Sequence, residues 1–205
     1  MQMSQVVNQL SRRIPPWVIY VAGIGWLVWL FYLAATNQMG PEPINQLERA
    51  YGEVALKLIV VGLMITPLRQ WTGVNLIKFR RAIGVTAFIF VLGHFLVWAI
   101  LDVQSLGRIW TEVIKRPYIT VGFVAFVMMI PLAITSNNPS IRMLGSYWRQ
   151  LHKLTYPTAV FAAVHYIWLV KGFQVEPIIY ALIIGGLLAL RIAPRKNPQR
   201  AQMAG

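Results

Sequence analysis

Three histidines are the residues of this chain whose type and placement point most clearly to chemistry. His94 lies in the apolar segment RRAIGVTAFIFVLGHFLVWAIL, and His152 and His165 lie in WRQLHKLTYPTAVFAAVHYIWLV. A titratable side chain in hydrocarbon is costly and by default marks a functional site. Imidazole is also the commonest metal ligand in proteins and the usual axial ligand of haem iron. We therefore predict a membrane protein that binds haem and carries electrons.

The composition fits a membrane protein that spans the bilayer several times. Of its 205 residues 57% are hydrophobic and 12% are charged, and the mean hydropathy is +0.58. Soluble domains have about twice that charged fraction, roughly 25%. The chain has no cysteine, which excludes disulfides, iron–sulfur clusters and covalently attached haem. Any haem must therefore be held non-covalently, by histidine.

The apolar segments predict an all-α membrane protein built as a bundle of six transmembrane helices. A membrane-spanning helix needs roughly 20 mainly apolar residues. Six stretches meet or approach this length, at about 17–36, 52–68, 82–101, 117–135, 150–170 and 177–193. We expect residues 1–16 to form a cytoplasmic N-terminus, 17–193 the transmembrane haem domain, and 194–205 a basic cytoplasmic tail.

The distribution of charge predicts the orientation of the bundle. Most of the 19 Lys and Arg residues lie at the two ends of the chain and in the second and fourth connections, whereas all six acidic residues lie on the other side. By the positive-inside rule, both termini are cytoplasmic. The net charge of +13 is thereby explained by topology, and we expect the partner surface to be membrane lipid and no nucleic acid.

Two of the histidines are predicted to face each other. His94 lies about 12 residues into the third predicted helix and His165 about 15 residues into the fifth, and both helices run outward from the cytoplasm. At a rise of about 1.5 Å per residue the two imidazoles reach similar depths, nearer the periplasmic face. Two imidazoles from facing helices can clamp a haem. We expect His94 and His165 to hold it between helices three and five.

The third histidine belongs to a different level of the bundle. His152 precedes His165 by 13 residues, about 20 Å of helix. The matching position before His94 is Arg81, next to Arg80. Arginine cannot ligate iron but binds a haem propionate or a flavin phosphate well. A second haem on His152 therefore stays open, and Arg80, Arg81 and Arg149 are candidates for an anionic cofactor on the cytoplasmic side.

Simpler interpretations and other functions compete with this hypothesis. An intramembrane histidine can hydrogen-bond across helices, and arginines at helix ends can serve topology alone. A stand-alone reductase of ferric iron or oxygen would need no partner. A proton-coupled transporter could use the histidines as proton relays, although the acidic residues that such relays often contain lie at one surface here.

Two motifs resemble the ferric-reductase-like transmembrane family, and within it the haem-binding membrane subunits of methionine sulfoxide reductase systems. They are R-R-x-x-G-x-x-x-F…H, from Arg80 to His94, and R-x-L-G-x-x-W-R-x-L-H-x-L-x-Y…H, from Arg142 to His165. The resemblance implies a b-type haem, an FMN and a location in the bacterial inner membrane. It also implies electrons from quinol or a flavin reductase, and a periplasmic molybdopterin-containing partner that reduces methionine sulfoxide. Catalysis is then expected on the partner, with no catalytic residue in this chain.

Overall fold

The computed structural model describes residues 2–170 and 174–192, and all regular structure in these residues is helical. The all-α prediction is confirmed for this part of the chain. The longer helices are α1 (Gln2–Arg13), α2 (Trp17–Ala35), α3 (Pro43–Thr72), α4 (Arg80–Leu96), α6 (Pro117–Ile134), α9 (Thr155–Leu169) and α10 (Val175–Ile192). Shorter helical pieces are η1 (Ile77–Phe79), the π-helical η2 (Val97–Val103), α5 (Leu106–Lys115), α7 (Asn138–Leu144), α8 (Ser146–Leu151) and η3 (His152–Leu154).

Four of these helices are long and apolar enough to cross a membrane. Among the described residues they are Trp17–Ala35, Pro43–Thr72, Ile77–Val103 and Pro117–Ile134. Each contains one of the first four segments that hydropathy predicts, whereas α9 and α10 are not among them. A membrane bundle is therefore supported, and the count of six spans stays a prediction.

The structure differs from the sequence prediction at the start of the second and fifth segments. Helix α3 begins at Pro43, well before residue 52, because proline has its φ angle preset for the first helical turn. The predicted helix at 150–170 is divided: α8 ends at Leu151, and a 3-10 turn precedes α9. Pro157 has no amide hydrogen for the carbonyl of Lys153, so the α-helical pattern is interrupted at that turn.

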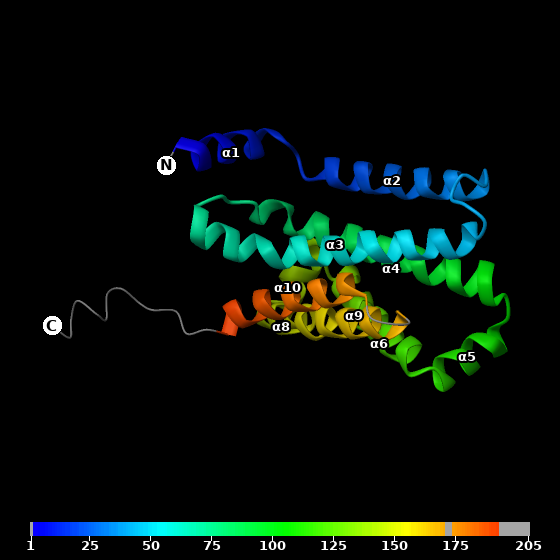
Figure 1. Ribbon diagram of the computed structural model, residues 1–205. Coiled ribbons are helices and arrows are strands. Elements are labelled where there is room, and N and C mark those ends of the chain that lie inside the picture. Colours follow the sequence, from blue (N-terminus) through cyan, green and yellow to red (C-terminus); the bar gives the residue numbers. More distant parts are fainter. Residues whose placement is uncertain (1, 171–173, 193–205) are drawn as a thin grey trace.

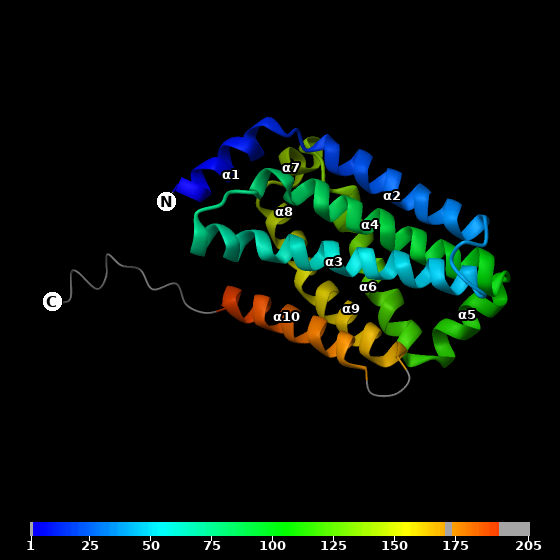
Figure 2. The same cartoon turned by 45° about the horizontal axis from the view of Figure 1, so that its top comes forward.

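The long helices lie side by side as one bundle (Figure 1). Helix α1, the α3–α4 connection and the C-terminal end of α10 lie at one end, and the α2–α3 turn and α5 lie at the other. The turned view in Figure 2 shows the same separation. The basic connections of the sequence thus gather at one end of the bundle, which we call the basic end.

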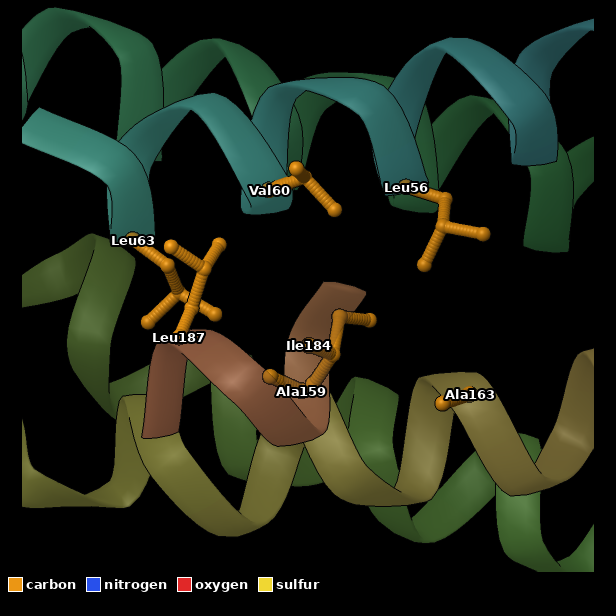
Figure 3. Close-up of a cluster of buried hydrophobic side chains, with 7 residues drawn as sticks. All are labelled: Leu56, Val60, Leu63, Ala159, Ala163, Ile184 and Leu187. Carbon is orange, nitrogen blue, oxygen red and sulfur yellow. The ribbon is translucent and has the colours of Figure 1, made fainter. Parts of the chain in front are cut away.

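Two clusters of buried side chains fix the helices that carry His94 and His165. The first joins α3, α9 and α10 and is shown in Figure 3: Leu56, Val60, Leu63, Ala159, Ala163, Ile184 and Leu187. The second joins α2, α3, α4 and η2: Leu30, Leu47, Tyr51, Ala55, Phe90 and Val97. Because Ala163 and Phe90 are buried within one helical turn of the two histidines, the clusters set the depth of both rings.

Helix α1 is held against the basic end rather than extending from it. The side chain of Asn8 donates to the carbonyl of Gly73 at 3.1 Å and accepts from the amide of Asn75 at 2.8 Å. Lys78 donates to the carbonyl of Ile14 at 2.8 Å. These bonds join α1 and its following turn to the α3–α4 connection, so residues that were expected only as a cytoplasmic N-terminus form part of the fold.

Substituting leucine for Ala159 should destabilise the bundle, because this side chain is 0% exposed within the first cluster and leucine adds three carbon atoms there. Overpacking of this kind costs about 1–3 kcal/mol. The apparent melting temperature in detergent, followed by size-exclusion chromatography after heating, should fall. Val160→Leu is the matched control, since its side chain is 45% exposed, and equal melting temperatures for both variants would contradict the packing described above.

Candidate metal centre and adjoining cavity

His94 and His165 lie next to each other between two different helices. Both are close to the C-terminal ends of their helices, α4 and α9. Their ring centroids are 6.3 Å apart and their planes make an angle of 78°. The structure thus brings together the two histidines that the sequence paired.

Each of these imidazoles has one nitrogen committed to a backbone carbonyl. His94 Nδ1 lies 2.8 Å from the carbonyl oxygen of Glu48, and His165 Nδ1 lies 2.7 Å from that of Tyr118. A carbonyl oxygen only accepts hydrogen bonds, so Nδ1 must carry the proton in both rings. The Nε2 atom of each ring therefore keeps its lone pair, which is the form in which imidazole ligates a metal.

The spacing of the two rings is compatible with two imidazoles that hold one metal ion. Metal–imidazole bonds are about 2.0–2.1 Å long for zinc, so an ion midway between opposed imidazoles separates their ring centroids by about 6 Å. Within the described residues, no group of three or more His, Cys, Asp or Glu side chains could hold a metal ion by itself. The two histidines could hold haem iron, because the porphyrin would supply its other ligands.

His152 has a different set of contacts. Its ring stacks on Trp148 with centroids 3.9 Å apart, and its Nε2 lies 3.1 Å from the hydroxyl oxygen of Thr135. That hydroxyl donates its single hydrogen to the carbonyl of Pro131 at 2.6 Å. His152 Nε2 must then be the donor to Thr135, which leaves Nδ1 as its free nitrogen.

A cavity of about 680 Å³ lies beside His152 at the basic end of the bundle. Cofactor and ligand pockets are typically about 300–1,000 Å³ in volume. The cavity has apolar side chains from α3, α4 and α6, and its described lining includes no acidic residue. Five cationic residues line it: Lys78, Arg80, Arg81, Arg149 and Lys153.

The cavity unites the candidates that the sequence placed on the cytoplasmic side. Arg80, Arg81, Arg149 and His152 all line it, whereas His94 and His165 do not. Arg81 also donates to the side-chain oxygen of Asn138 at 2.8 Å, which fixes its guanidinium against α7. An arrangement of several cations without a nearby carboxylate is suited to binding an anionic group.

Sequence reasoning missed part of both sites. The charge pattern assigns Lys78 and Lys153 to topology alone. The buried hydroxyl of Thr158 in the cavity wall has no hydrogen-bond partner among the described residues, and nothing in the sequence points to it. The carbonyls that bind the two imidazoles could not be recognised by residue type, because every residue has one. Their nearest sequence signal is the glycine four residues after each, Gly52 and Gly122.

The family match and the similar proteins of known name agree with each other. Residues 50–163 match the family described as "Ferric reductase like transmembrane component". Proteins named "Protein-methionine-sulfoxide reductase heme-binding subunit MsrQ" from Brucella ovis, Brucella canis and Brucella suis are 43% identical to the chain over 178 residues. The match covers 86% of this chain and 81% of each relative. No solved structure gives a significant match.

Proposed function

The chain belongs to the family of ferric reductase-like transmembrane components, and we propose that it is the haem-binding electron-transfer subunit of a methionine sulfoxide reductase system. The observation that carries the proposal is the His94–His165 pair, with ring centroids 6.3 Å apart and both Nε2 atoms free to bind a metal. The MsrQ relatives, which are named as heme-binding subunits, support it.

His94 and His165 would hold a b-type haem, which supplies a one-electron carrier within the membrane. The role of the protein is to present the two Nε2 atoms and to keep water away from the site. The aromatic side chains between α4 and α6 contribute to this, since Phe95 stacks on Phe126 with centroids 4.8 Å apart. Apolar and aromatic packing of this kind suits the porphyrin ring.

The topology that we propose has six spans and places both termini in the cytoplasm of a bacterial cell, with the bundle in the inner membrane. The positive-inside rule supports it, because the basic end carries most of the cationic connections. The His94–His165 pair lies toward the opposite end, which is then periplasmic. Electrons would accordingly enter near the cavity and leave near the pair.

We propose the cavity as the site of an anionic cofactor at the cytoplasmic end, with FMN as the expected occupant. Arg80, Arg81 and Arg149 would bind its phosphate, and the apolar wall would pack against its ring system. A quinol or a cytoplasmic flavin reductase would supply the electrons. The acceptor would be a periplasmic molybdopterin-containing subunit that reduces methionine sulfoxide in oxidised proteins, so that catalysis lies on the partner.

Reduced-minus-oxidised visible spectra and the haem-to-protein ratio of detergent-purified protein test the haem proposal. Wild type should show a b-type spectrum, and His94→Ala and His165→Ala should each lose it, because one axial ligand is removed. His152→Ala should keep this spectrum. The nearly perpendicular imidazole planes also predict a strongly anisotropic low-spin signal in electron paramagnetic resonance.

The outcome that would overturn the proposal is wild-type protein without haem, purified from cells that make haem normally. The intramembrane histidines would then be better explained as proton relays of a transporter. Retention of the full spectrum in both His94→Ala and His165→Ala would instead reject these two residues as the ligands.

The cavity proposal predicts that Arg80→Gln and Arg149→Gln weaken FMN binding by about tenfold or more, the size expected for loss of one hydrogen bond to a charged group. Riboflavin, which lacks the phosphate, should be affected much less by the same changes. Equilibrium titration of flavin fluorescence measures both ligands. Arg142→Gln is the control, because Arg142 is an exposed cation that does not line the cavity. An equal loss of FMN and riboflavin binding would show that Arg80 and Arg149 do not contact the phosphate.

A further inference from the structure

The two paired imidazoles each lie against a glycine of a neighbouring helix. A Cβ atom added to Gly52 in α3 would be 3.2 Å from His94 Nδ1 and 3.4 Å from its Cε1. One added to Gly122 in α6 would be 2.7 Å from His165 Nδ1 and 2.8 Å from its Cε1. Any residue with a side chain would therefore press on the ring, more severely at Gly122 than at Gly52.

Each glycine also lies four residues after the carbonyl that accepts the imidazole hydrogen bond. In an α-helix the carbonyl of residue 48 is paired with the amide of residue 52, and that of residue 118 with the amide of residue 122. A side chain on the later residue would stand beside the carbonyl and obstruct its second lone pair. With glycine there, Glu48 and Tyr118 can each accept a second bond from an imidazole.

The same arrangement of a carbonyl and a glycine four residues later occurs twice, on two different helix pairs. We name the carbonyl of Glu48 with Gly52 the α3 cradle, and the carbonyl of Tyr118 with Gly122 the α6 cradle. The α3 cradle receives His94 from α4, and the α6 cradle receives His165 from α9. Such recurrence at both histidines, and at the same spacing, connects the glycines with ligand presentation rather than with general helix packing.

We propose that the two cradles are positioning elements that fix each imidazole with its proton on Nδ1 and direct its Nε2 into the space between the rings. The inference rests on the proposed function, since it concerns how the chain presents axial ligands. Partners that hold the second nitrogen of a ligating imidazole set its orientation and raise its basicity, and their loss typically costs about 10–100-fold in metal affinity or activity. Gly52 and Gly122 contact no metal themselves, so their effect is transmitted through the histidines.

The test compares Gly52→Ala, Gly122→Ala and Gly185→Ala in the full-length protein. Gly185 is the matched control, because it also lies inside a helix but an added Cβ would meet nothing within 4 Å. The measurements are the haem-to-protein ratio, the electron paramagnetic resonance spectrum and the midpoint potential of the purified proteins. If the glycines served helix packing alone, Gly52→Ala and Gly122→Ala would lower the yield of folded protein. The spectrum and the midpoint potential of the protein that does fold would then match those of wild type.

Gly122→Ala should lose haem, with affinity lower by about tenfold or more, because the His165 ring must move away from its carbonyl. Gly52→Ala should retain haem, since the contact there is milder, but with a changed resonance spectrum and a shifted midpoint potential. Gly185→Ala should match wild type in all three. If Gly122→Ala does not accumulate as folded protein, the spectrum and potential of Gly52→Ala decide the question.

Wild-type haem content, spectra and potentials in both cradle variants would overturn the inference while leaving the proposed function intact, provided that His94→Ala and His165→Ala still lose haem. Haem-free wild type, or full haem retention in those histidine variants, would instead be a failure of the proposed function. The two results are therefore distinguishable in one set of proteins.

Discussion

The hydrogen bonds from His94 and His165 to backbone carbonyls are the interactions on which the candidate site depends. An imidazole N–H in an apolar interior is costly without an acceptor, because no water is available to replace it. The only backbone acceptors that a transmembrane helix offers along its length are carbonyls already bonded within the helix. A second bond requires close approach of the neighbouring helix, and each histidine bonds to a partner helix that its own helix packs against. The orientation of each histidine therefore depends on how closely its helix packs against the neighbouring helix.

The bundle has a different chemical environment at each of its two ends. At one end each paired imidazole bonds to a backbone carbonyl and lies next to the other ring. At the basic end the cavity is lined by five cations without a carboxylate among its described lining. A neutral ligand pair favours a metal, and a cluster of cations favours an anion. The proposed direction of electron transfer follows from the positions of these two sites relative to the basic connections.

Much of this arrangement could be predicted from residue types and spacing. Intramembrane histidines are rare enough to be informative, and helical rise alone placed His94 and His165 at one depth, as the structure finds. The grouping of Arg80, Arg81 and Arg149 with His152 was likewise predicted, and all four line one cavity. The start of α3 was missed, because Pro43 acts through backbone geometry that hydropathy does not detect. The cradles were missed for a related reason, since carbonyl acceptors have no residue signature.

The contacts of His152 determine how readily a second haem could bind at the basic end. In both paired histidines Nδ1 is the donor and Nε2 is free, whereas in His152 Nε2 is the donor and the ring is stacked on Trp148. The counterpart expected opposite His152 is Arg81, which has no lone pair and donates to Asn138. A second haem bound through Nε2, as proposed for the paired histidines, would therefore require His152 to give up its hydrogen bond to Thr135. An anion would require no such change, because the cations around the cavity already supply its donors, and this asymmetry favours a bound phosphate or carboxylate at the basic end.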